Sequence, residues 1–343
     1  MSEETLLMVR NEMGAAGRGG SDALFRILFE NAPDAYYLSD ARGRLIDGNI
    51  AAEALVGYSK QELIGRSFLE LDILPKGQLS KAIGLLAKSA LRKPTGPDEI
   101  QLKRKDGTRV YAEIRTFPIV IRGRTVVLGI ARDVTERRRA FELLEETRDN
   151  MRRSRDALVE ALSRTIEVKD PTTAGHQRRV ADLAGAIAGE MNMPPDRVEA
   201  IRIAGMIHDI GKIAVPAEIL NKPGLLDEEE MQFIREHPKT GFEILQNLDG
   251  FETIARIIHQ HHERIDGSGY PRGLTGPEIL PETKVLSVAE AMEAMSSHRP
   301  YRPALGVENA MEELGRTKGT LYDSDVVEAC LRLFAREKYA FKP

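Results

Sequence analysis

The chain has 343 residues, which is more than one hydrophobic core usually organises, so two domains are expected. Its 42% hydrophobic and 30% charged residues are ordinary for domains that fold in water, and the formal net charge of -4 argues against a protein built mainly to bind DNA or RNA. Because the sequence has no run of eighteen apolar residues and no basic leader followed by an apolar segment, it predicts no membrane span, no signal peptide and a cytoplasmic location.

The first part of the chain predicts a mixed domain of helices and strands. Residues 1–20 show little apolar periodicity and are expected to form a flexible leader. Ser59 is expected to cap a short helix, and Lys105-Asp106-Gly107 to form a hairpin turn. In chain order, the predicted elements are a helix in DALFRILFEN, strands in AYYLSD and RLIDGN, short helices in NIAAEALVG and SKQELIG, a helix over 79–91, and strands in PDEIQLKRKDG, TRVYAEIRTFPIVIRG and RTVVLGIARDV.

This order of two strands, several short helices and three long antiparallel strands resembles the PAS sensor domain. The phrases GYSKQELIG and RKDGT carry the resemblance, together with the ending ARDVTERRRA, and they imply a sensor over residues 21–136. The first 175 residues contain neither histidine nor cysteine, which excludes a His-ligated haem and a cysteinyl flavin adduct. The sensor's ligand stays unknown: a non-covalent flavin, a small metabolite, a weakly specific apolar pocket and no ligand at all remain open.

Residues 137–160 predict a long charged helix. Apolar residues step alternately by three and four, a spacing that fits a coiled-coil seam and favours a parallel homodimer held through this helix and the sensor domain. Arg148 and Arg155 interrupt the seam, since each would face its own mate in a parallel dimer, and a solvated linker helix is the alternative. The seam positions are Phe141, Leu144, Arg148, Met151, Arg155, Leu158, Leu162 and Thr165.

The rest of the chain predicts helices joined by short loops, and it contains all seven histidines. Imidazole and carboxylate groups are ligands of iron, manganese and zinc, and an aspartate can bridge two ions, so six such groups suit a pair of ions. Adjacent helical residues point about 100° apart, so His261 and His262 can share a site only if the backbone there is specialised. His259 and His298 are better interpreted as ordinary histidines. The candidate ligands are His176, His208, Asp209, His237, His261 and His262.

Four ordered phrases resemble the HD-GYP family of HD-domain phosphohydrolases almost throughout. They are DPTTAGHQRRVADLA, AGMIHDIGKIAVPAEILNKPG, REHPKTGFEIL and HHERIDGSGYPRGL, followed by the closing phrase GTLYDSDVVEACL. The family is named for the residues present here as His208-Asp209 and Gly269-Tyr270-Pro271. The resemblance implies an all-α HD-type helical bundle over residues 161–343, an α+β fold class for the whole chain, and hydrolysis of cyclic di-GMP to pGpG and/or GMP.

The resemblance also implies a role for each matched residue. Asp209 would bridge the two metals, and Lys212 would stand beside the scissile phosphate and supply positive charge. One metal would be held by His176, His208, Asp209 and Glu290, and the other by Asp209, His237, His261 and His262. The residues that would hold or shape the substrate are Asp170, Lys212, Tyr270, Arg299 and Arg302.

Two departures from the family pattern bear on the metals. Glu290 stands where the family has aspartate, which brings a longer side chain to a ligand position. Thr172 stands where some members have a glutamate for a third metal, so two ions, iron or manganese, are expected. The alternatives are a hydrolase acting on pGpG or another nucleotide phosphoester, and a receptor that binds a cyclic dinucleotide without cleaving it.

Overall fold

A computed structural model of the chain describes residues 18–121, 124–171, 175–222, 224–297, 304–336 and 339–341. The chain divides into two units, Met1–Asp149 and Asn150–Pro343, which are treated separately below. Four residues singled out by the sequence, Thr172, His298, Arg299 and Arg302, lie outside the described residues, as do residues 1–17 of the predicted leader, whereas its last three residues begin a helix at Arg18. No helix in the described part of the chain is long and apolar enough to cross a membrane.

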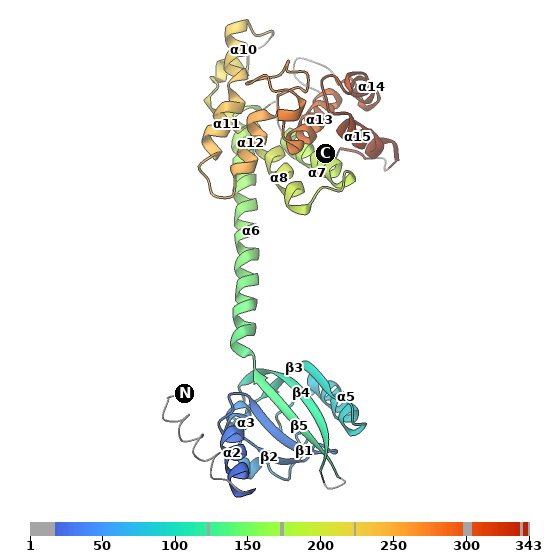
Figure 1. Ribbon diagram of the computed structural model, residues 1–343. Coiled ribbons are helices and arrows are strands. Elements are labelled where there is room, and N and C mark those ends of the chain that lie inside the picture. The colour runs from blue at the N-terminus through green and yellow to red at the C-terminus, as the bar shows by residue number, and fades with distance from the viewer. Residues whose placement is uncertain are drawn as a thin grey trace. The chain divides into compact units, whose positions relative to one another are not determined.

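The first unit is built on one antiparallel sheet of five strands, with the spatial order β2-β1-β5-β4-β3 (Figure 1). The strands predicted from alternating apolar residues are confirmed in number and position. The central strand β5 pairs along most of its length with both neighbours. Ala35 of β1 lies opposite Ala131 of β5, and Ala112 of β4 lies opposite Asp133 of β5. The strands are β1 (Ala35–Asp40), β2 (Leu45–Gly48), β3 (Thr95–Lys103), β4 (Arg109–Ile121) and β5 (Arg124–Asp133).

Two helices of this unit, α3 and α4, begin at polar capping residues. Asn49, which is completely buried, accepts hydrogen bonds from the amides of Ala52 and Tyr36, at 2.9 Å each, and caps α3. Ser59 is the N-cap of α4, as predicted, and forms a capping box with Glu62. The helices are α2 (Arg18–Glu30), α3 (Ile50–Val56), α4 (Lys60–Leu63) and α5 (Leu79–Ala90), with a 3₁₀ turn η1 (Lys76–Gln78).

A cavity of about 130 Å³ lies in the core of the first unit. Its polar lining is sparse, and Ser89 and Thr116 bond to each other through their hydroxyl oxygens at 2.8 Å. The Tyr37 ring fits against Gly129, where a Cβ atom would meet the ring at 2.0 Å, so β5 needs a glycine there. Apolar lining residues come from strands and helices alike and include Ala35, Leu55, Leu63, Leu85, Ile100 and Leu102.

The second unit is all helical among its described residues, as the sequence predicts. Its core surrounds α7, which packs against α8, α13 and α15 and buries Leu183 and Ile187 completely. Full burial of each such side chain contributes roughly 1.5–3 kcal/mol to the free energy of unfolding. The elements are α6 (Thr135–Lys169), α7 (His176–Glu190), α8 (Pro195–Ile207), η3 (Ile210–Ala214), α9 (Ala217–Leu220), α10 (Glu228–Arg235), α11 (His237–Leu245), α12 (Glu252–Gln260), η4 (Gly276–Glu278), α13 (Pro281–Ser296), α14 (Val307–Thr317) and α15 (Ser324–Arg336).

Helix α6 is continuous from Thr135 to Lys169, so the predicted boundary at residue 161 falls inside a helix. Its last turns belong to the second unit, because Val159 and Ile166 are buried in that unit's core. Phe141 and Leu144, two positions of the predicted coiled-coil seam, are exposed in the single chain. Arg155 pairs with Asp156 and Glu199 of its own chain instead of standing free in the seam. The domain limits stay predictions.

Candidate metal centre

Two groups of side chains in the second unit have the arrangement of metal ligands. Within each group, one nitrogen or carboxylate oxygen from every residue lies within 4.8 Å of those from the other two. Four of these six residues are buried: His176, His208, His237 and His261. One group is His176, His208 and Glu290, and the other is His237, His261 and His262.

The histidines stand at helix ends, where side chains from different helices can converge. His176 and His237 begin α7 and α11, whereas His208 and His261 follow the last residues of α8 and α12. Because α12 ends at Gln260, His261 and the next residue leave the helix. Their rings lie 4.1 Å apart at an angle of 38°, which removes the conflict expected of adjacent helical residues.

Asp209 lies between the two groups. Its Oδ2 atom is 3.5 Å from Nε2 of His208, and its Oδ1 atom is 3.4 Å from Nε2 of His237. One carboxylate oxygen therefore faces each group. This is the placement that a bridging aspartate requires in a centre with two ions.

Backbone carbonyls set which nitrogen of three histidines faces the centre. In each case Nδ1 bonds to the carbonyl oxygen of the third residue before it, at 2.6–2.9 Å. A neutral imidazole has one N–H, so Nδ1 donates it and Nε2 keeps a lone pair. The pairs are His208 with Gly205, His237 with Ile234, and His261 with Ile258.

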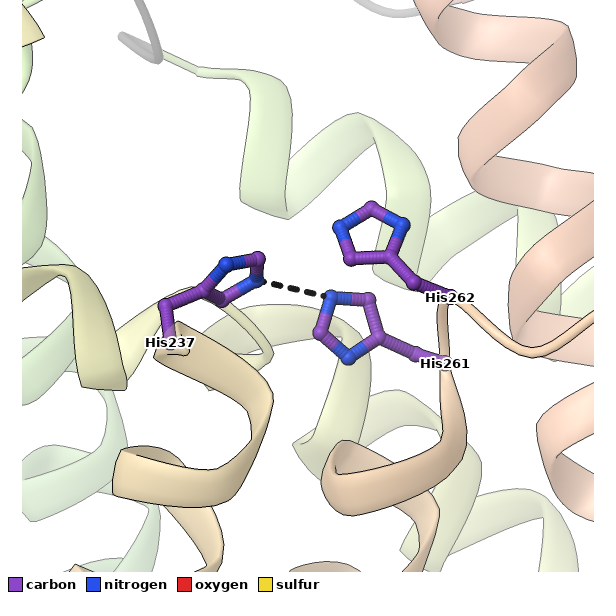
Figure 2. A group of neighbouring side chains, drawn as sticks. All are labelled: His237, His261 and His262. Atoms are coloured by element: carbon purple, nitrogen blue, oxygen red, sulfur yellow. Dashed lines mark hydrogen bonds between the residues drawn. The ribbon is translucent and has the colours of Figure 1, made fainter. Parts of the chain in front are cut away.

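Two of these lone pairs, on Nε2 of His237 and Nε2 of His261, face one another. Figure 2 shows Nε2 of His237 aimed at Nε2 of His261, and the two atoms lie 3.1 Å apart. Two acceptors cannot bond without a cation or a proton between them. Burial lowers the pKa of both rings, well below the usual value for His261, so a proton is disfavoured. A metal ion fits this arrangement.

Unpartnered atoms in the other group support the same conclusion. Nε2 of His208 and Oε2 of Glu290 are buried, and neither has a hydrogen-bond partner among the residues that the structure describes. Leaving such groups unpaired costs roughly 1–3 kcal/mol each. A divalent cation coordinated by both would remove that cost.

The ionisation states also suit a metal. Burial alone would raise the pKa of Asp209, but the charges around it, Lys212 first, outweigh burial and hold the pKa well below its usual value. The pKa of Glu290 is also lowered, although burial alone would raise it. Burial lowers the pKa of His262 to about 3. Neutral imidazoles and ionised carboxylates are the forms that bind divalent ions.

The predicted substrate residues that the structure describes lie beside this centre. Nζ of Lys212 is 2.9 Å from Oδ2 of Asp209 and 3.4 Å from Oδ2 of Asp170. Burial alone would lower the pKa of Lys212, but the two aspartates raise it, so the amine is charged. The Tyr270 ring lies 4.7 Å from the His262 ring. Arg299 and Arg302 fall outside the described residues.

Glu293 was not predicted as a site residue, and it holds His176 from the side away from the centre. Glu293 is completely buried, and its Oε2 atom bonds to Nδ1 of His176. Its Oε1 atom accepts hydrogen bonds from Nε of Arg179 and Oγ of Ser297, each at 2.8 Å. A carboxylate behind a ligand histidine orients the ring and raises its basicity. The available signal was a second glutamate three positions after Glu290 on one helix.

Glu263 was missed as well, and it fixes the loop that carries Tyr270. This buried carboxylate accepts hydrogen bonds from the backbone amides of Arg272, at 2.8 Å, and Leu274, at 2.9 Å. Gly269 packs so closely against the backbone of Arg264 that a Cβ atom on it would lie 2.4 Å from the Arg264 backbone nitrogen. The glycine of the Gly-Tyr-Pro triplet is therefore required by packing.

Comparison with known proteins finds two family matches and several curated relatives. Residues 160–326 match the HD domain and residues 33–136 match the PAS domain. The chain is 38% identical over 192 residues to the cyclic di-GMP phosphodiesterase response regulator RpfG of Xanthomonas campestris, covering 55% of this chain and 50% of that protein. It is 42% identical over 178 residues to a cyclic di-GMP phosphodiesterase of Thermotoga maritima, covering 51% and 48%.

A third relative is named for a different substrate. The chain is 38% identical over 175 residues to the 3′3′-cGAMP-specific phosphodiesterase 3 of Vibrio cholerae, covering 51% of this chain and 38% of that protein. The chain thus spans about half the length, or less, of these curated relatives.

Proposed function

Because the chain contains a PAS domain and an HD domain, we propose that it is a metal-dependent phosphodiesterase that cleaves cyclic di-GMP to pGpG and/or GMP under control of its sensor domain. The observation that carries the proposal is the pair of buried ligand groups joined by Asp209. Two of the relatives are named for cyclic di-GMP, which supports that substrate over others.

The proposed centre holds two divalent ions, iron or manganese, for which a donor set of imidazole and carboxylate is suited. When bound, such ions supply Lewis acidity and lower the pKa of a water nucleophile. Asp209 would serve both ions. The first would add His176, His208 and Glu290, and the second His237, His261 and His262.

Lys212 is proposed to act on the scissile phosphate. Its buried ammonium keeps its charge next to Asp209 and Asp170, so it is ready to stabilise negative charge that develops on phosphate oxygens. Tyr270 lies against His262 at the edge of the centre, where a base or ribose of the substrate would lie. Arg299 and Arg302 are proposed to hold the remaining phosphate, since a guanidinium matches phosphate geometry.

Turnover on a panel of substrates tests the proposal. With iron or manganese supplied, the full chain is expected to hydrolyse cyclic di-GMP with a higher kcat/KM than 3′3′-cGAMP or pGpG. A preference for either of the others would change the substrate, and binding without any hydrolysis would make the domain a receptor. The same preparation should contain two metal ions per chain, and three would contradict the proposed centre.

A parallel homodimer through α6 and the sensor domain is part of this proposal. Phe141, Leu144 and Met151 expose most of their surface along α6, with exposed fractions of 59%, 65% and 68%. Exposed apolar residues at this spacing favour a coiled-coil partner. A dimeric mass of the same preparation would support this, and a monomer at working concentration would remove it.

We also infer that the sensor cavity takes a small uncharged molecule. Cavities of about 150 Å³ lined by aliphatic and aromatic side chains hold a molecule the size of benzene, and this one is of about 130 Å³. Lys60 at the lining pairs with Asp47 at 2.5 Å and with Glu30 at 3.1 Å, so it is not free to bind an anionic ligand. A ligand with one hydroxyl could bond to Tyr37.

Phenol and toluene are therefore expected to bind the full chain and raise its Tm. Tyr37→Phe should weaken phenol binding by about 2- to 10-fold, the worth of one hydrogen bond, and leave toluene binding unchanged. Tyr36→Phe is the matched control, because Tyr36 does not line the cavity. Calorimetric titration measures both affinities. If neither compound binds at millimolar concentration, the cavity is not a site for this class of ligand.

A further inference from the structure

The last turns of α6 contact the backbone from which the candidate ligand His176 projects. Oε1 of Glu167 accepts a hydrogen bond from the amide of Gly175 at 2.8 Å. Gly175 is the N-cap of α7, and His176 is the first residue of that helix. The bond therefore ties α6 to the start of α7, one residue before the ligand.

Gly175 can make this contact because it has no side chain. Its φ of 70° lies in the left-handed region, and a Cβ atom would lie 2.8 Å from Nη1 of Arg179. Arg179 passes over this glycine to reach Glu293, with Nη2 at 2.7 Å from Oε1. Glu293 in turn bonds to Nδ1 of His176.

These residues form one connected set around the ligand, which we call the His176 clamp: Glu167, Gly175, Arg179 and Glu293. Glu293 sets the orientation of the His176 ring, and Glu167 sets the position of its backbone. The Glu293 end is completely buried, and the Glu167 end is half-buried on α6. A displacement of α6 would therefore act on His176 through Glu167.

A second contact from the same end of α6 reaches the same centre. Asp170 directly follows the helix, is buried, and lies 3.4 Å from Nζ of Lys212. Ile166 anchors this turn in the core of the unit. The end of α6 thus contacts the backbone just before His176 and also Lys212, the proposed phosphate-binding lysine. The earlier turns of α6 carry exposed apolar residues.

We propose that Glu167 is a positioning residue that couples the signalling helix α6 to the metal ligand His176, so that the position of α6 sets metal affinity at the centre. The proposal rests on the proposed metal-dependent function. Glu167 touches neither substrate nor metal. It acts by holding the first turn of α7 where the His176 ring meets the other donors of its group.

Metal binding by the full chain tests the coupling, with Co²⁺ alone as the probe. Glu167→Ala should weaken Co²⁺ binding at one of the two sites by about 10-fold or more, the usual effect of removing a residue that orients a ligand. The visible spectrum of the bound Co²⁺ should change as well. Glu167→Gln keeps an oxygen that can accept the Gly175 amide, so it should restore both affinity and spectrum.

Glu160→Ala is the matched control. Glu160 lies two turns earlier on α6 and pairs with Arg178 at 2.6 Å and Arg164 at 3.4 Å, all on the surface, without touching the clamp. It should bind Co²⁺ as the wild type does. Unchanged Co²⁺ affinity in Glu167→Ala, or an equal loss in both alanine variants, would overturn the proposal.

Two further measurements keep the outcomes distinct. The Tm of each metal-free variant separates loss of fold from loss of the site, and a Glu167→Gln variant that folds but does not recover binding would also count against the proposal. If the wild type binds metal but hydrolyses no cyclic dinucleotide, the proposed function fails while the Co²⁺ comparison still decides the role of Glu167.

Discussion

Replacing His208 with alanine is expected to abolish turnover of cyclic di-GMP. His208 is completely buried, and its unpartnered Nε2 faces the centre next to Asp209. Without that donor one ion should be lost, so metal content should fall from two ions to one. Because the ions supply several kcal/mol of transition-state stabilisation, kcat should fall by about 10³-fold or more.

His259→Ala is the matched control for this prediction. His259 lies on the neighbouring helix α12, stacked on Phe242 at 4.7 Å, and belongs to neither ligand group. It should keep both metal content and kcat. Since His208 is part of the core, Glu290→Gln provides a second variant of nearly unchanged shape that removes a ligand charge. Persistent hydrolysis by folded protein of either ligand variant would contradict the assigned centre.

Replacing Lys212 with methionine should lower kcat by roughly 10²- to 10³-fold, the effect of losing one preorganised charge at the reacting group. Metal content should stay at the wild-type value, because Lys212 donates to Asp209 and does not belong to a ligand group. Lys222→Met is the control, since Lys222 pairs with Glu230 away from the centre. A normal kcat in Lys212→Met would remove the lysine from the mechanism.

The same variant should change the pH dependence. Burial raises the pKa of Asp209, and Lys212 is the first of the charges that lower it. Without the lysine, the pKa of Asp209 rises, so this carboxylate is protonated at a higher pH. The acid limb of the pH profile of kcat/KM should therefore move toward neutral pH. An unchanged acid limb would show that Lys212 does not set the pKa of Asp209.

Much of the fold could be predicted because its signals are local. Alternating apolar residues identify the five strands, and Ser59 marks the start of α4. The ligand candidates were predicted from residue types that suit divalent ions and from ordered phrases that resemble the HD-GYP family. The boundary between signalling helix and catalytic domain at residue 161 stays a prediction, and residue 161 lies inside the continuous helix α6.

What could not be predicted depends on residues far apart in the chain. Glu293 is 117 positions from His176, and its burial is visible only when α7 and α13 pack together. Arg155 appeared as a free cation in a coiled-coil seam because its partner Glu199 lies on another helix. Periodicity describes one helix at a time, so neither contact leaves a local signal.

The sequence by itself determined which donors are present, which segments are helix or strand, and that histidine and cysteine are missing from the sensor. These properties follow from side-chain chemistry and from spacing along the chain. Only the tertiary structure decided that carbonyls hold three imidazoles with Nε2 inward, that two of these lone pairs meet at 3.1 Å, and that Asp209 faces both groups. Helix packing determines these relations, because it alone sets burial and the direction in which each donor points.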